Sequence, residues 1–329
     1  MSTNSESFSS GKIIREPAGF ANGYWAGAPG VFFAADEQAW YLTYRVRRPR
    51  GVAPDRGGEA RIARSTDLHN WQDVWSVTKD KFGSASIERS ALLKGKDGLW
   101  RYFTSYVDPA DGRWCVSVLK SDDVRTFDPS QCKPLFKAAS LDMEGVKDPW
   151  IFAHDGAFYM FLSVALPTEK TSQQSHATLD IYNTGECTSA TGLAISCDLE
   201  NWRWQGVIFR PGKTGWDCYC RRINSVIPYH QKFIAFYDGS SGHAENYEEK
   251  TGLAVSSDLH RWACLSPSSP VLTSPNSSGS LRYIDAQPAS GSTGSLNFFY
   301  EFARPDSAHD LRITSLPAET VFGSRLGAL

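Results

Sequence analysis

The stretch Ser65-Thr66-Asp67-Leu68-His69-Asn70-Trp71 returns three more times along this chain, and its spacing decides the fold. The further copies occupy residues 121–127, 196–202 and 256–262. Each copy has a serine, an aspartate two residues later, an aliphatic residue next and an aromatic residue six positions after the serine. The copies begin between 56 and 75 residues apart. Intervals of this length exceed those of helical solenoids and are typical of one propeller blade per copy.

The repeated aspartates are interpreted as turn residues. Asp67, Asp123, Asp198 and Asp258 each follow a strand-like run, where an aspartate side chain accepts hydrogen bonds from nearby backbone N–H groups. One active site does not need four copies of the same residue. The repeat therefore indicates how the chain is built rather than what it does.

The composition indicates a globular chain that is rich in β-structure. Of its 329 residues 41% are hydrophobic, and the formal net charge is -2. The 11 Trp, 13 Tyr and 18 Phe favour strands over helices. A near-neutral charge balance provides no basic surface for nucleic acid or for an anionic membrane, so we expect neither as a partner.

The cysteines and the lack of long apolar segments indicate the cellular compartment of the protein. No stretch approaches the roughly 20 apolar residues that a membrane-spanning helix needs, and the first ten residues are polar, unlike a signal peptide. The seven cysteines are scattered, and Cys218 and Cys220 have one residue between them where a zinc or redox pair usually has two. We expect reduced thiols in a cytoplasmic protein, with no disulfide framework, no cofactor and no metal site.

A hairpin of two apolar runs precedes each copy of the repeat, and a fifth hairpin follows the last copy. We therefore predict an all-β, five-bladed β-propeller that forms a single domain over residues 1–329. The expected blades lie near residues 24–80, 86–137, 146–210, 220–270 and 281–316. A strand from the segment around Lys12 to Glu16 is expected to complete the last blade, because a ring must cover its edges. The alternative is a β-sandwich or mixed fold in which the repeats are coincidental.

The innermost strand of each propeller blade lines a central channel, so the starts of these strands locate a pocket. Three long loops, at residues 45–58, 166–191 and 239–251, are expected to rim the same mouth. Setting the hairpins side by side aligns one position from each blade. These positions are Ala28, Ser90, Asp148, Ile223 and Ala286.

Carboxylates and guanidinium groups converge near these positions. The acidic candidates are Glu88, Asp148, Asp285 and Glu301, and the basic ones are Arg89, Arg222 and Arg282. Glycoside hydrolysis needs a pair of carboxyl groups that flank the scissile bond, one protonated and one ionised. The aromatic residues nearby are suited to stacking on sugar faces: Tyr24, Trp25 and Tyr283.

The chain resembles the five-bladed propeller glycoside hydrolases of the arabinanase, xylosidase and invertase superfamily. The resemblance rests on Lys147-Asp148-Pro149-Trp150, on the run 156–161 and on the repeated phrase, and it covers nearly the whole chain as architecture. It implies an Asp of the first blade as base or nucleophile, a second Asp in an Asp-Pro motif that orients the site, and a Glu on a further blade as general acid. Asp148 matches the second of these.

The other two positions of the family pattern do not match. Ala28 stands where the first-blade Asp is expected, and Arg222 to Asn224 stand where the acidic Glu is expected. The chain therefore uses a displaced set of carboxylates, performs a variant reaction or has lost activity. Glu88, Asp285 and Glu301 are the candidates for a displaced set.

Two further groups are candidates for substrate binding. His243 lies on a rim loop, where a histidine is suited to act as acid, base or sugar ligand. The arginines of the first rim loop are Arg45, Arg47, Arg48 and Arg50. They form either a solvated face or, if turned inward, a site for a sugar that bears carboxylate or phosphate.

We therefore predict an enzyme similar to glycoside hydrolases, which cleaves a glycosidic bond in a short or modified saccharide. Carboxylate acid/base chemistry in the channel would carry the reaction. Two alternatives stay open: a non-catalytic carbohydrate-binding propeller, and a lyase or phosphorylase on the same scaffold.

Overall fold

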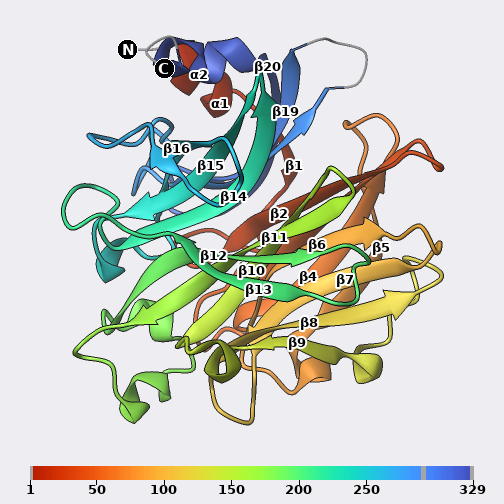
Figure 1. Cartoon of the computed structure of the whole chain (residues 1–329). Helices are drawn as coiled ribbons and strands as arrows, with labels where there is room; N and C mark the ends of the chain where they lie inside the picture. Colours follow the sequence, from red (N-terminus) through yellow and green to blue (C-terminus); the bar gives the residue numbers. More distant parts are fainter. Residues whose placement is uncertain (1–2, 290–293, 327–329) are drawn as a thin grey trace.

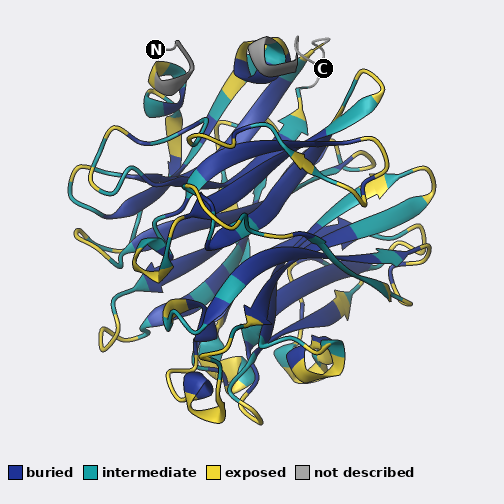
Figure 2. Cartoon of the chain, turned by 60° about the vertical axis from the view of Figure 1, so that its left-hand side comes forward, coloured by how far each residue is buried: buried dark blue, intermediate teal, exposed yellow. Residues whose placement is uncertain are grey.

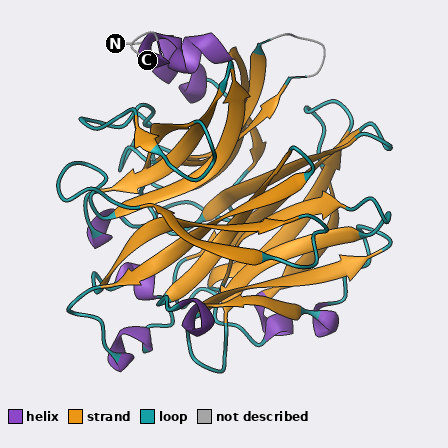
Figure 3. Ribbon diagram, in the orientation of Figure 1, coloured by secondary structure: helices purple, strands orange, loops and turns teal. Residues whose placement is uncertain are grey.

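The computed structural model describes residues 3–289 and 294–326, and within them the regular structure is nearly all β (Figures 1 and 3). The helices are α1 (Thr3–Ser9), α2 (Ala318–Leu326) and the short 3-10 turns η1 (Lys79–Phe82), η2 (Pro129–Gln131), η3 (Ala138–Leu141), η4 (Gln173–His176), η5 (Ile181–Asn183) and η6 (His243–Glu245). None of the helices described is long and apolar enough to cross a membrane.

The strands within the described residues fall into five consecutive antiparallel groups. The first contains β2 (Trp25–Ala34), β3 (Ala39–Arg48), β4 (Arg56–Ser65) and β5 (Gln72–Thr78). The second contains β6 (Ile87–Lys94), β7 (Trp100–Val107), β8 (Trp114–Ser121) and β9 (Lys133–Lys137). The third contains β10 (Gly145–His154), β11 (Ala157–Pro167), β12 (Cys187–Ser196) and β13 (Arg203–Phe209).

The last two groups complete the chain. The fourth contains β14 (Cys220–Tyr229), β15 (Lys232–Ser240), β16 (Lys250–Ser256) and β17 (Ala263–Cys264). The fifth contains β18 (Leu281–Pro288), β19 (Ser295–Ala303) and β20 (His309–Pro317). The strand expected near Lys12 is present as β1 (Lys12–Arg15), and it pairs with β20 through Lys12 and Ile313. The fifth group thus has a fourth strand from the start of the chain.

Apolar side chains fill the space between neighbouring groups. Phe103 of the second group lies in one cluster with Met160 and Leu162 of the third. The fifth group packs against the first in the same way, through Phe299 and Leu42. Figure 2 shows the buried residues concentrated in the strands and the exposed ones in the loops. Burial of these interfaces between groups, rather than one central core, holds the fold together.

Both terminal helices lie on the same cluster of the fourth and fifth groups, at one edge of the molecule (Figure 1). Phe8 of α1 meets Phe298 with ring centroids 5.3 Å apart. Phe322 of α2 meets Phe236 at 6.3 Å. The two ends of the chain are thereby fixed to neighbouring surfaces.

The repeated phrase forms the same hydrogen-bonded turn in three of its copies. In the first, the Ser65 hydroxyl accepts from the backbone N–H of Leu68 at 3.0 Å, and Asp67 Oδ1 accepts from the N–H groups of His69 and Asn70, both at 2.8 Å. Asp198 and Asp258 accept the equivalent pairs of bonds. The turn role predicted for these aspartates is confirmed.

The repeated tryptophan connects one group to the group before it. The indole of Trp202, in the third group, donates to Leu199 O at 3.2 Å and meets Phe103 of the second group edge-to-face at 5.8 Å. Trp262 meets Phe161 in the same way, at 6.0 Å. Trp71 of the first group meets Phe299 of the fifth, also at 6.0 Å. The repeat therefore joins neighbouring groups.

Replacing Trp202 with Ala is expected to lower the free energy of unfolding by about 2 kcal/mol, because a half-buried aromatic contact between two groups is lost. Urea denaturation followed by circular dichroism measures the change. Trp202→Phe keeps a ring against Phe103 and serves as the control, with a smaller loss expected. Equal stability of Trp202→Ala and the wild type would show that the repeat does not join the groups.

Candidate active site

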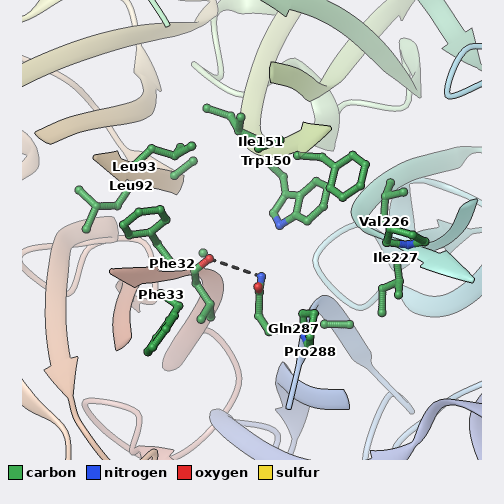
Figure 4. Close-up of a pocket in the computed structure, with 17 residues that line it drawn as sticks. Phe32, Phe33, Leu92, Leu93, Trp150, Ile151, Val226, Ile227, Gln287 and Pro288 are labelled. Atoms are coloured by element: carbon green, nitrogen blue, oxygen red, sulfur yellow. Dashed lines mark hydrogen bonds between the residues drawn. The ribbon is translucent and has the colours of Figure 1, made fainter. Parts of the chain in front are cut away.

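The first strand of each group faces a common channel, and one end of that channel is apolar. Residues of β2, β6, β10, β14 and β18 line a cavity of about 290 Å³, and Figure 4 shows the five strands around it. Phe32, Leu92, Ile151 and Ile227 contribute apolar side chains from four of these strands. Gln287 contributes an amide, which donates to Val31 O at 3.4 Å. Since the described lining carries no ionisable side chain, acid/base chemistry has to be sought at the other end.

At that other end, every one of the five strands has a shift of register near its start. The shifts fall between residues 27 and 30, 87 and 90, 147 and 150, 223 and 225, and 282 and 285. Ala28, Asp148 and Tyr283 have φ values of 54°, 56° and 53°, which are uncommon for residues with a side chain. Bulges of this kind redirect side chains, and strained backbone clusters at functional sites.

The shifts correct the alignment of strand starts that the sequence suggested. The first residues within the irregular steps are Ala28, Glu88, Asp148, Asn224 and Tyr283. Ser90, Ile223 and Ala286 were expected at this level instead. The physical reason is that a bulge adds residues to one strand without adding them to its partner, which a comparison of apolar runs does not detect.

A continuous series of buried ion pairs crosses this end of the channel, and we call it the ion chain. Four guanidinium groups alternate with three carboxylates in the order Arg47, Glu88, Arg45, Glu301, Arg282, Glu249 and Arg222. Apart from the close pair at the Arg222 end, the N···O distances lie between 2.6 and 3.0 Å. No side chain of the ion chain is more than 7% exposed.

The carboxylates of the ion chain are held in their ionised form. Burial opposes ionisation of Glu88, but Arg45, Lys147 and Arg47 outweigh it and lower its pKa to about 2. Burial likewise opposes ionisation of Glu301 and Glu249, and their arginine partners lower the pKa of each. These three groups are therefore poor proton donors at neutral pH, and their contacts fit them to position arginines.

Glu301 also fixes the start of β2. Its Oε2 accepts from the backbone N–H of Ala28 at 3.1 Å, and its Oε1 lies 2.8 Å from His309 Nδ1. A Cβ atom at Gly27 would collide with the same carboxylate, so glycine permits this close approach. Glu301, expected as an acid/base candidate, thus lies at the site with every oxygen engaged.

Asp238 is the carboxyl group here whose environment favours a bound proton. Burial, and then the charge of Glu249, raise the pKa of Asp238 to about 7. Its Oδ1 accepts from the backbone N–H of Tyr283 at 3.0 Å, whereas its Oδ2 has no hydrogen-bond partner among the described residues. Asp238 is not among the site residues predicted from the sequence. The available signal is its hairpin position opposite Arg222, which matches that of Glu301 opposite Arg282.

Asp148 lies on the other side of Tyr283 from Asp238. Its Oδ2 accepts from the Tyr283 hydroxyl at 3.2 Å and lies 3.5 Å from Lys147 Nζ, while its Oδ1 accepts from the backbone N–H of Arg89 at 3.3 Å. Asp148 is 3% exposed and Asp238 is fully buried. One tyrosine, contacted at its backbone by one carboxyl group and at its hydroxyl by the other, therefore separates the two groups.

Asp285 and Arg89 lie deeper in the channel. Arg89 Nε donates to Pro29 O at 2.8 Å and its Nη1 donates to Asn224 O at 2.9 Å, so this side chain spans three of the five strands. Asp285 lies 3.6 Å from Arg89 Nη2 and accepts from the Val31 N–H at 2.8 Å; burial raises its pKa to about 6. Both residues separate the charged end from the apolar cavity.

The structure brings some of the expected binding residues to the ion chain and leaves others outside. Trp25 stacks on His309 at 4.8 Å with 21° between the ring planes, and the Arg282 guanidinium lies 5.0 Å from its ring. The Arg282 guanidinium also lies 5.1 Å from the Tyr283 ring. Tyr24 is half-buried, and its ring lies against Gly19 instead.

The other two expected ligands also lie elsewhere. His243 is exposed on η6, beside Gly185 of the neighbouring loop. Arg48 pairs with Glu59 at 2.8 Å on the outer side of the first group. Arg45 and Arg47 turn inward and pair with Glu88, so the cluster does not form one solvated face. The alternation of side chains along β3 explains the division.

Asp238→Asn is expected to stabilise the protein at neutral to alkaline pH. The folded-state pKa of about 7 lies above the ordinary value of 3.8. The folded protein therefore retains a proton that the unfolded chain releases, and stability falls as the pH rises from about 4 to 7. A neutral amide removes this dependence, so the variant should gain about 2–4 kcal/mol over the wild type at pH 8. Urea denaturation at pH 4, 6 and 8 measures the difference; a variant less stable than wild type at pH 8 contradicts it.

Comparisons with known proteins identify the fold through solved structures. No protein-family profile and no curated protein sequence matches the chain. An endo-arabinase from Bacteroides thetaiotaomicron VPI-5482 is 15% identical with a TM-score of 0.58, over 91% of this chain and 97% of that one. A thermostable family-43 glycoside hydrolase is 15% identical with a TM-score of 0.59, over 88% and 89%.

A third solved structure with this fold is that of a phosphorylase. The β-1,2-mannobiose phosphorylase from Listeria innocua, in complex with β-1,2-mannobiose, is 13% identical with a TM-score of 0.61. The similarity covers 97% of this chain and 95% of that one. The chain thus has the fold of arabinanase- and xylosidase-type glycoside hydrolases, as the resemblance in its sequence implies.

Proposed function

We propose that this chain, which shares its fold with those enzymes, is a carbohydrate-active enzyme that cleaves a glycosidic bond at the charged end of the channel. The observation that carries the proposal is the pair formed by Asp148 and Asp238. Asp238 has a pKa of about 7 and an Oδ2 without a hydrogen-bond partner among the described residues, and Asp148 is held by Lys147, Tyr283 and a backbone N–H. Two carboxyl groups with different environments are what acid/base cleavage of a glycoside requires.

The roles follow from these environments. Asp238 donates its proton to the glycosidic oxygen as the bond to the sugar breaks. Asp148 orients the attacking water and accepts its proton, while Lys147 and the Tyr283 hydroxyl fix the position of the carboxylate. The ion chain supplies a rigid, buried frame, because each of its carboxylates contacts two guanidinium groups.

We also propose that the five groups are the five blades of one closed propeller. Two contacts support closure: Phe299 and Leu42 share an apolar cluster, and Trp25 of β2 bridges to His309 of β20. In this arrangement β1 completes the last blade through its pairing with β20.

Access to the charged end requires the rim loops to move, because both Asp148 and Asp238 are buried. The loop between β11 and β12 is attached to the loop of the first group, where Arg56 Nη2 donates to Leu179 O at 2.9 Å and lies 3.8 Å from Asp180. Loop opening of this kind commonly accompanies binding and release.

Phosphorolysis is the second candidate reaction, and Ala28 favours it. The start of β2 provides no carboxylate, so hydrolysis depends on Asp148 to activate water. Inorganic phosphate is itself a nucleophile: its oxygen bonds to the anomeric carbon, the glycosidic C–O bond breaks, and Asp238 protonates the leaving oxygen. This reaction needs one carboxylic acid rather than two.

A screen of aryl-glycosides and oligosaccharides, with and without inorganic phosphate, tests the proposal. We expect release of sugar in one arm: free sugar from hydrolysis, or sugar 1-phosphate when phosphate is the nucleophile. Saturable binding of sugars without any cleavage would contradict the enzyme proposal and indicate a carbohydrate-binding propeller.

A further inference from the structure

The ion chain contains one more positively charged group than negatively charged groups. Its four guanidinium groups face three carboxylates. His309 lies between Glu301 and Glu248, and these two carboxylates raise its pKa against the effect of burial. His309 and Glu248 contact each other at 3.1 Å and are not counted among the four guanidinium groups and three carboxylates. An uncompensated charge in a buried place is costly unless a counter-ion binds.

Arg47 is the end of the ion chain that lies nearest to solvent. Arg47 contacts one carboxylate of the ion chain, Glu88 at 3.0 Å, and Glu88 is shared with Arg45. Arg222 at the opposite end likewise contacts one carboxylate of the ion chain, Glu249. Arg47 is the most exposed member of the ion chain, with its side chain 7% exposed, so it lies closest to solvent.

Buried hydrogen-bond donors without partners surround Arg47. Trp25 Nε1, Arg45 Nη1 and the Tyr247 hydroxyl oxygen are buried and have no hydrogen-bond partner among the described residues. The Arg47 guanidinium lies 5.1 Å from the Trp25 ring and 4.5 Å from the Tyr247 ring. The two rings lie 5.7 Å apart. Nitrogen donors of Trp and Arg cannot accept a hydrogen bond, so their partner has to be an acceptor.

We propose that Trp25, Arg45, Arg47 and Tyr247 form a subsite for an oxyanion, which is either the carboxylate of a uronic acid sugar or inorganic phosphate. Both ligands supply negative charge and acceptor oxygens, and arginine binds both with paired N–H donors. The inference deepens the proposed function, on which it rests for the assignment of the bound anion to a substrate. A neutral sugar offers hydroxyl groups but leaves the charge of Arg47 unbalanced.

Isothermal titration calorimetry with three probes tests the subsite: sodium glucuronate, inorganic phosphate and methyl glucoside, at constant ionic strength. We expect glucuronate or phosphate to bind at least tenfold more tightly than methyl glucoside. Arg47→Met should weaken that binding at least tenfold, and Arg47→Lys, which keeps the charge but not the paired donors, should weaken it less. Preference for glucuronate identifies a uronide substrate, and preference for phosphate identifies phosphorolysis.

Arg101→Met is the matched control. Arg101 is 3% exposed and pairs with Asp97 and Glu200, at the end of the fold away from the ion chain. The Arg101→Met variant should bind the anion as tightly as the wild type does. Circular dichroism identifies any variant that is not folded, and the conservative Arg47→Lys then carries the test.

Two results overturn the subsite: equal affinity for all three probes, or unchanged anion binding in a folded Arg47→Met. These outcomes are separate from failure of the proposed function. If the protein cleaves neutral glycosides but binds neither anion, the subsite proposal is wrong and the proposed function stands. If the protein binds an anion through Arg47 but cleaves no glycoside, the subsite stands and the proposed function is wrong.

Discussion

Asp238→Asn is expected to slow cleavage of a glycoside with a poor leaving group by roughly 10²–10⁴-fold, the usual contribution of a general acid. Asp238 has a pKa of about 7 and an Oδ2 without a hydrogen-bond partner among the described residues, whereas the carboxylates of the ion chain are held ionised. A good leaving group such as dinitrophenolate departs without protonation. The variant should therefore retain most of its activity on a dinitrophenyl glycoside, and kcat/KM for the two substrate types measures the contrast.

A second buried aspartate provides the control for this prediction. Asp217 is 1% exposed and pairs with Arg221 at 2.7 Å, outside the ion chain. Asp217→Asn should leave the ratio of the two rates unchanged. If Asp238→Asn slows both substrates equally, or neither, Asp238 is not the general acid.

Glu301→Gln is expected to lower the free energy of unfolding by about 3–5 kcal/mol, the usual cost of breaking a buried ion pair from one side. The change removes the charge between Arg45, at 3.0 Å, and Arg282, at 2.6 Å. It leaves two guanidinium groups adjacent in a buried place, where their repulsion is poorly screened. Chemical denaturation at pH 7 measures the loss.

Glu59→Gln is the matched control for Glu301→Gln. Glu59 also contacts two arginines, Arg48 at 2.8 Å and Arg61 at 2.6 Å, but on the partly exposed outer side of the first group. Its loss should cost less than about 1 kcal/mol, because solvent screens exposed pairs. Similar costs for the two variants would show that burial of the ion chain contributes nothing to stability.

The architecture was accessible from the sequence because its signals are local. The first two strands of each group are joined by a short connection, and the phrase first seen at Ser65 to Trp71 marks the same point in four of the five groups. The turn bonds of Asp67, Asp198 and Asp258 lie within three residues of the aspartate. The strand at Lys12 was also predictable, since an unpaired edge at β20 needs a partner.

The site was predictable only in part, because its members meet through contacts between distant segments. Asp148 was accessible through its Asp-Pro motif at a strand start. The hairpin position of Asp238 was visible in the sequence, but its raised pKa was not, since that depends on burial and on Glu249. The arginine partners of Glu88, and Arg45 as a partner of Glu301, come from another group, so the sequence does not distinguish a carboxylate locked by arginine from one that is free to act.

Measuring kcat/KM of wild type and Asp148→Asn on the glycoside found in the screen shows whether the charged end of the channel carries the reaction. Asp148 is the residue on which the sequence resemblance and the geometry of the charged end agree. We expect kcat/KM to fall by at least roughly 100-fold in a folded Asp148→Asn protein, as removal of an acid/base group causes. Cleavage that continues undiminished in Asp148→Asn would contradict the assignment of the reaction to this end of the channel.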